Sequence, residues 1–279
     1  MLKKKIDTWP VIIACVIFVI QCAGLALSPL WAGLLGLSFL YFCGTIAAFQ
    51  HHHGHVSVFR NKKLNEILDL MMSFQTGIAP YAWVLHHNIG HHGNYLNQYP
   101  VQEHKILDAS NWTREDGSVM NRWEYVFYNR IRMHKRCKEI GQKAKSIYKK
   151  YRLFRSLNLL ATLIFLWINP ISALILFVAI PQLMVLLVFE TTYDHHSGLH
   201  TDNKFEASRN ILSRMYNISR LNLGYHTAHH VKPGLHWSDL PTYHASIVQE
   251  IPSALIDRDE GLLLALQKTI LPVKSRKES

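Results

Sequence analysis

The four long apolar segments of this chain constrain its fold more than any other feature. A helix needs roughly 20 predominantly apolar residues to cross the hydrocarbon core of a bilayer. Two such segments lie near the amino terminus and are separated only by the uncharged turn Ser28-Pro29, and two more meet at Asn169-Pro170, a strong turn signal. We therefore expect an all-α integral membrane protein with four transmembrane helices in two hairpins, at residues 11–27, 30–49, 152–168 and 171–189.

The remaining chain is expected to be helical as well. A cleaved signal peptide is the alternative for the first segment, since Gly24-Leu25-Ala26 resembles a cleavage site, but a second apolar segment follows at once and favours an uncleaved helix. Residues 61–85 predict an amphipathic or partly re-entrant helix, and residues 250–270 predict a surface helix. We expect residues 1–279 to form a single membrane domain.

The positive charges are concentrated at one end of the predicted spans. Three lysines precede the first span, and residues 101–156 contain 14 of the 30 Lys and Arg residues against six Asp and Glu residues, whereas the two turns are uncharged. Because cytoplasmic loops carry an excess of Lys and Arg, both termini and the central segment are predicted to be cytoplasmic, in a bacterial inner membrane or the endoplasmic reticulum. This loop accounts for the net charge of +11, so no nucleic-acid partner is expected.

Most histidines lie in four short clusters. The clusters are "HHHGH" at 51–55, "HHNIGHH" at 86–92, "DHHSGLH" at 194–200 and "HTAHH" at 226–230, and they hold all but four of the 18 histidines. Each follows a predicted span or lies just beyond one, so all four should meet on the cytoplasmic side. The sequence therefore predicts a helical cytoplasmic cap, residues 50–150 and 190–279, that carries the histidines.

The spacing within the clusters suits metal binding. Residues three or four apart share one side of a helix, so two imidazoles there can direct nitrogens at one ion about 2 Å away. Such sets are His51 with His55, His87 with His91 and the adjacent His92, and His226 with His229 and His230. The register within the runs stays open, because His52, His86 and His195 could replace His51, His87 and His196.

The number of histidines favours two metal ions over one. A structural zinc ion takes about four ligands, and this face offers more than twice that number. Imidazole alone does not select the metal, since it suits iron, zinc, copper and nickel.

Three motifs make the chain resemble the integral-membrane fatty acid desaturase and hydroxylase superfamily. They are "HHHGHVSVFRNKKLN", "WVLHHNIGHHGNY" and "NLGYHTAHHVKPGLHWSDLP", which resemble the first, second and third histidine boxes, and "TTYDHHSGL" is similar to the segment that holds an additional family histidine. The resemblance implies a membrane domain in which histidines hold two irons. It places the ligands at His51, His55, His87, His91, His92, His196, His226, His229 and His230.

The chain departs from the superfamily pattern near the additional histidine. Where several members have Asn four residues before it, this chain has Thr192, which puts a water-linked contact to the second iron in doubt. Glu190 and Asp194 also lie nearby. They could orient ligating imidazoles, or they could simply be solvated at the end of the helix.

The resemblance implies an oxidoreductase that uses two irons and O₂ to remove hydrogen from an unactivated C–H bond of a membrane lipid or acyl thioester. Desaturation is the favoured outcome, and hydroxylation or ketolation of a lipid, alkane or terpenoid is the alternative. No haem, Cys₄ rubredoxin or dinucleotide motif is evident, so electrons should come from a separate ferredoxin-, rubredoxin- or cytochrome b5-type donor. The basic residues 130–155 could dock such a donor if it is acidic.

Two other classes of protein fit less well. A metal transporter could collect zinc with histidine clusters, but its spans would usually contain polar or ionisable residues, and these spans contain almost none. A membrane zinc peptidase would need H-E-x-x-H, and none of the clusters offers the glutamate.

Overall fold

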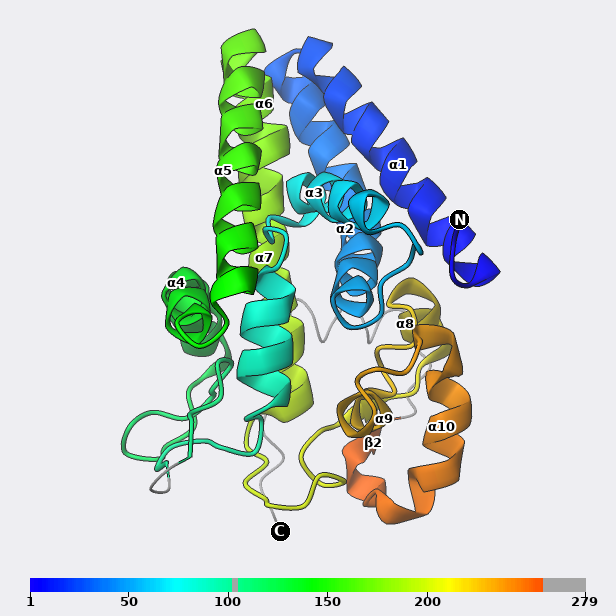
Figure 1. Ribbon diagram of the computed structural model, residues 1–279, viewed down its shortest axis with the longest axis vertical. Helices are drawn as coiled ribbons and strands as arrows, with labels where there is room; N and C mark the ends of the chain where they lie inside the picture. Colours follow the sequence, from blue (N-terminus) through cyan, green and yellow to red (C-terminus); the bar gives the residue numbers. More distant parts are fainter. Residues whose placement is uncertain (102–104, 258–279) are drawn as a thin grey trace.

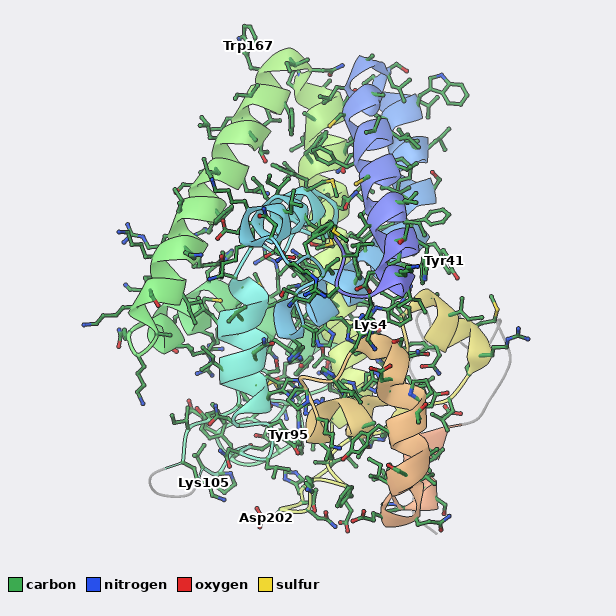
Figure 2. The ribbon with its side chains drawn as sticks, turned by 45° about the vertical axis from the view of Figure 1, so that its right-hand side comes forward. Lys4, Tyr41, Tyr95, Lys105, Trp167 and Asp202 are labelled. Carbon is green, nitrogen blue, oxygen red and sulfur yellow. The ribbon has the colours of Figure 1, made fainter. Side chains whose placement is uncertain are left out.

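The computed structural model describes residues 1–101 and 105–257, and in this part of the chain nearly all regular structure is helical. The long helices run along the long axis of the molecule, and the shorter carboxy-terminal helices gather at one end (Figure 1). All four histidine clusters lie toward that end, which we call the histidine end. Lys105 and Asp202 also lie there, whereas Trp167 marks the opposite end (Figure 2). The all-α prediction is confirmed.

Within the described residues, four helical segments are long and apolar enough to cross a membrane, as predicted. They are Lys5–Ala26 (η1 Lys5–Asp7, α1 Thr8–Ala23 and η2 Gly24–Ala26), Pro29–His55 (α2), Lys145–Ile168 (α5) and Pro170–His196 (α6 Pro170–Ala173, the π-helix η4 Leu174–Ala179 and α7 Ile180–His196). All four extend beyond the predicted bounds at the histidine end. The apolar pattern marks only the part that can face lipid, whereas a helix satisfies its own backbone and can continue into polar sequence.

Shorter elements complete the described chain. They are α3 Lys62–Thr76, the π-helix η3 Trp83–His92, α4 Arg122–Gly141, β1 Asn210–Ile211, α8 Arg214–Ser219, α9 His226–Val231, η5 Trp237–Asp239, α10 Leu240–Ile247, η6 Val248–Glu250, η7 Ser253–Leu255 and β2 Ile256–Asp257. The two strands pair in parallel, with Asn210 opposite Ile256. The surface helix predicted for 250–270 is wrong over 250–257, where 3₁₀ turns and β2 are found, and its remainder lies outside the described residues.

Buried glutamines link the long helices. The Nε2 atom of Gln21 on α1 donates to the carbonyl oxygens of Phe74 and Leu176 at 3.0 and 2.8 Å, and Gln75 Nε2 donates to Ala14 O at 2.7 Å. Such bonds tie helices together where apolar contact gives little preference over lipid. The carboxy-terminal end of α3 therefore packs among the long helices.

The predicted helix at 61–85 is interrupted at Gly77. The side chain of Asn61 caps the amino terminus of α3 by accepting from the backbone N–H groups of Lys63 and Leu64. Gly77 ends the helix with φ of 72°, in the left-handed region, and a Cβ there would lie 2.5 Å from the carbonyl oxygen of Pro181. The chain can therefore turn closely past α7 and enter η3.

One apolar core joins the long helices to the carboxy-terminal helices. Phe49 on α2, Met72 on α3 and Met184 on α7 belong to the same buried cluster as Leu240 on α10. The histidine end is thus packed onto the long helices, which holds the histidines in fixed relative positions.

Candidate metal centre

The first histidine cluster lies on the last turn of a long helix. α2 continues through the cluster to His55, so His51 and His55 stand one turn apart on the same side, as their spacing predicts. Both rings belong to one group of five whose possible ligand nitrogens all lie within 4.8 Å of one another. This group consists of His51, His55, His87, His92 and His229, and we call it group 1.

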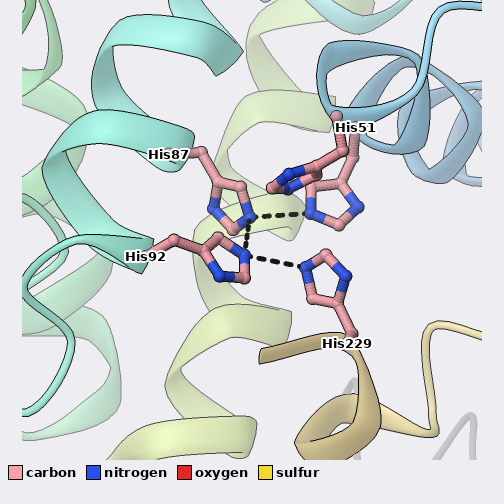
Figure 3. A group of neighbouring side chains, drawn as sticks. His51, His87, His92 and His229 are labelled. Atoms are coloured by element: carbon pink, nitrogen blue, oxygen red, sulfur yellow. Dashed lines mark hydrogen bonds between the residues drawn. The ribbon is translucent and has the colours of Figure 1, made fainter. Parts of the chain in front are cut away.

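The rings of group 1 converge through their Nε2 atoms (Figure 3). His51 Nε2 lies 2.7 Å from His87 Nε2, which lies 3.0 Å from His92 Nε2, which in turn lies 2.9 Å from His229 Nε2. A neutral imidazole nitrogen carries either one proton or one lone pair, so it makes a single good hydrogen bond. Three contacts along four nitrogens exceed what hydrogen bonding alone satisfies. Converging lone pairs of this kind fit a cation.

A second group lies beside the first. The possible ligand nitrogens of His91, His196 and His230 also lie within 4.8 Å of one another, and we call this set group 2. His226 adjoins it, because its Nε2 atom lies 2.9 Å from His196 Nε2 and 3.2 Å from His230 Nε2. The structure thus brings together all nine histidines named from the resemblance, and their role as iron ligands stays a prediction.

The grouping differs from the one that helical spacing indicates. His87 shares group 1 with His92, whereas His91, four residues after His87, belongs to group 2. In an α-helix two residues five apart point about 140° away from each other. Residues 83–92 instead form a π-helix, whose wider turn reduces that angle. His91 and His92, adjacent on η3, therefore belong to different groups. His230 and the adjacent His229 on α9 also belong to different groups.

The structure also separates the alternative histidines from the groups. His195 has partners on both nitrogens, with Nδ1 2.8 Å from Arg209 O and Nε2 3.2 Å from the Tyr216 hydroxyl. His52 and His86 are buried outside both groups. The geometry therefore favours His51, His87 and His196.

A carboxylate that sequence reasoning missed holds one ring of group 2. Both carboxylate oxygens of Asp108 lie 2.9 and 3.0 Å from His91 Nδ1, and both side chains are 1% exposed. Gln98 Nε2 and the backbone N–H of Ser110 donate to the same carboxylate. Because a carboxylate only accepts, His91 carries its proton on Nδ1 and its Nε2 lone pair faces group 2.

Two observations show that the groups fit metal ions. The Nε2 atoms of His55 and His91 are buried and have no hydrogen-bond partner among the described residues. The pKa values of His87, His92, His226, His229 and His230 lie well below the ordinary histidine value, because burial disfavours the charged form and neighbouring imidazoles would repel it. Neutral imidazoles keep the lone pairs that a metal requires.

Comparison with known proteins places the chain in a family. The fatty acid desaturase family model matches residues 8–259. The chain belongs to the fatty acid desaturase family. No curated protein and no solved structure matches it.

Family membership, with four helices able to cross a bilayer, makes this a membrane protein and an oxidoreductase of the desaturase and hydroxylase kind. The family is known for histidine-ligated metal centres, with which the two histidine groups are compatible.

The acidic residues near His196 bind an arginine rather than imidazoles. Arg122 of α4 donates to Glu190 and, at 2.6 Å, to Asp194. The Thr192 hydroxyl donates to Val188 O within its own helix. None of these three side chains hydrogen-bonds a histidine ring of either group among the contacts of the described residues, so the possible orienting role of Glu190 and Asp194 is not observed.

A small apolar cavity adjoins group 1. Its wall includes His87, Trp83, Val185 and Phe189, and it encloses about 30 Å³. That volume suits roughly two water molecules and not an acyl chain. An acyl chain could therefore occupy this cavity only if side chains of η3 or α7 moved aside.

Proposed function

We propose that this desaturase-family protein uses two irons and O₂ to introduce a double bond into a fatty acyl lipid. The observation that carries the proposal is the convergence of the nine histidines in two adjoining groups within a chain of this family. Group 1 would hold one iron, and group 2 with His226 would hold the other. When bound, the iron pair supplies the reduction of O₂ and the removal of hydrogen from an unactivated C–H bond.

The protein side chains would hold, orient and shield this centre. Asp108 fixes the ring of His91, and the carbonyl oxygen of Ala207 lies 2.9 Å from His196 Nδ1 and fixes the second ring. All the rings except His55 and His92 are buried, which limits access of bulk water.

The substrate is proposed to be a membrane lipid or acyl thioester that arrives from the bilayer. Each CH₂ taken from water contributes about 0.8 kcal/mol, so a long acyl chain favours the apolar interior near the ends of the long helices. The cavity lined by Val185 and Phe189 is the place where the chain would enter. Hydroxylation or ketolation of a lipid, alkane or terpenoid is the alternative reaction.

Electrons are proposed to come from a separate ferredoxin-, rubredoxin- or cytochrome b5-type protein. Lys143, in the turn between α4 and α5, and Lys145 and Lys149, at the start of α5, are exposed and would attract an acidic donor. Charge reversal of these lysines should lower turnover and its dependence on salt, and unchanged values of both would contradict the proposed docking surface.

We propose that the histidine end and both termini face the cytoplasm, because residues 101–156 carry the excess of positive charge. A membrane-impermeant lysine reagent added to intact cells should leave the exposed Lys143 and Lys145 unlabelled until the membrane is opened. Labelling in intact cells would contradict this orientation.

The test of the proposed function is iron content and lipid mass in membranes that contain the chain. We expect about two irons per chain and an O₂-dependent lipid product lighter by two hydrogens. His229→Ala should lower both values, whereas His134→Gln, a histidine outside the groups, should leave the iron content unchanged. Products heavier by one oxygen would select hydroxylation. Zinc without an O₂-dependent product would reject the proposal and favour a metal transporter.

A further inference from the structure

The outer side of α4 carries large apolar side chains that no part of the described chain covers. Trp123, Phe127 and Ile131 recur every four residues and are 52, 51 and 77% exposed. They form a stripe along one flank of the helix, because residues four apart share a side. Exposed apolar stripes of this kind are unusual on a surface that contacts only water.

Contacts of α4 show which way this stripe faces. Arg130 Nε lies 3.1 Å from Gln182 Oε1 on α7, and His134 Nδ1 lies 2.7 Å from the Tyr151 hydroxyl on α5. Phe127 and Ile131 precede these two residues by three positions each, so they lie on the same flank. The stripe therefore lies on the flank of α4 that is nearer the long apolar helices than the histidine end, and it is exposed there.

Along the long axis of the molecule, α4 lies where the exposed apolar surface of the long helices begins. Two residues after Tyr151, Leu153 begins the exposed apolar surface of α5, which continues through Leu160 and Leu163. Figure 1 shows α4 nearly end-on while α5 runs along the long axis, so α4 lies across the direction of the predicted spans. This is the orientation of a helix that lies in a membrane surface.

The charge beside the stripe complements one lipid class. Lys135 and Lys138 follow Ile131 by four and seven positions and are exposed. On the opposite side of the molecule, at a similar height in Figure 1, α8 exposes Met215 and Ile218 next to Arg214. Basic residues that border exposed apolar side chains are the pattern of surfaces that bind anionic headgroups.

We propose that the Trp123, Phe127 and Ile131 stripe of α4 inserts into the lipid interface around the spans, with Lys135 and Lys138 on anionic headgroups. The occupant is thus lipid of the protein's own bilayer and not a second protein. α4 also carries Arg122, which binds Glu190 and Asp194 just before His195 and His196. Lipid contact on its outer side would hold this helix against α7.

The test measures which small molecules reach α4 in a bilayer. The full chain, with Cys15→Ala and Cys22→Ala, is spin-labelled at Phe127→Cys, at Ile131→Cys or at the control Arg132→Cys, whose wild-type guanidinium lies over Tyr128 on the opposite flank. The buried Cys43 and Cys137 remain, and the background protein reports residual labelling. Each protein is placed in vesicles of phosphatidylcholine and phosphatidylglycerol.

We expect labels at 127 and 131 to collide mostly with lipid-soluble O₂ and the label at 132 mostly with a water-soluble chromium complex. Equal chromium access at all three positions would overturn the proposal, as would shielding at 127 and 131 that appears only after a soluble electron donor is added. Use of two stripe positions guards against misfolding of one variant. In vesicles without phosphatidylglycerol, or with Lys135→Gln and Lys138→Gln, both labels should become shallower. Unchanged depth would overturn the role of the lysines.

Discussion

Replacement of Asp108 by asparagine should weaken the binding of one metal ion and leave the binding of the other unchanged. Asp108 contacts His91 Nδ1 at 2.9 and 3.0 Å, is 1% exposed, and touches no ring of group 1 in the hydrogen bonds of the described chain. Asp108→Asn preserves the shape and one acceptor but removes the negative charge that faces His91 Nδ1. Loss of such an outer partner typically lowers metal affinity about 10- to 100-fold, which corresponds to about 1.4–2.7 kcal/mol.

The assay is an iron titration of the purified chain against a chelator of known affinity. The wild-type chain should take up two irons, and the Asp108→Asn chain should show one site with wild-type affinity and one site weakened by that factor. Asp116→Asn, an exposed carboxylate in the same segment that accepts from Ser118, is the matched control and should leave both sites unchanged. Two sites of unchanged affinity, or equal weakening of both, would refute the assignment of Asp108 to group 2.

Three further predictions concern stability. Arg122→Gln should cost about 3 kcal/mol of unfolding free energy because it leaves the buried Glu190 and the half-buried Asp194 without their cation. Arg114→Gln, at a partly exposed pair, should cost much less, and equal unfolding free energies of the two variants would contradict this. Gly77 has φ of 72°, and an added Cβ would lie 2.5 Å from the Pro181 carbonyl oxygen, so Gly77→Ala should lower stability by more than about 2 kcal/mol. Gly198 has φ of 78° but open space around it, so Gly198→Ala should lower stability by about 1 kcal/mol. Denaturation in detergent measures both values. Burial and nearby Arg155 and Arg130 lower the pKa of His134 to about 4, so as the pH falls below about 6.5 the unfolded chain binds a proton at this histidine before the folded chain does. The free energy of unfolding should therefore decline by about 1–2 kcal/mol between about pH 6.5 and about pH 4, allowing for the partial exposure of the ring. A His134→Asn chain whose stability falls with the same slope would exclude this origin.

The sequence was sufficient for the features that repeat locally. Four apolar segments predict four long helices, and the structure contains them. The histidine clusters follow these helices, so the ends of α2 and α7 bring His51, His55 and His196 to the same region as η3 and α9. Patterns of this kind are visible because hydrophobicity and residue type alone determine them.

Other features of the site depend on contacts that sequence spacing does not encode. The division of His91 and His92 between two groups follows from the π-helix at 83–92. Nothing in the amino-acid sequence of this segment distinguishes a π-helix from an α-helix. Asp108 lies 17 residues after His91, and the described residues next to it, 105–112, belong to no helix or strand, so the approach of Asp108 to His91 depends on how the loop folds. The binding of Glu190 and Asp194 to Arg122 depends on how α4 packs across α7.

The most direct test of the metal centre is an anomalous diffraction map of the iron-loaded chain at the iron absorption edge. The account predicts two peaks, one about 2 Å from the Nε2 atoms of group 1 and one about 2 Å from those of group 2 and His226. A single peak, or a peak away from these nitrogens, would contradict it.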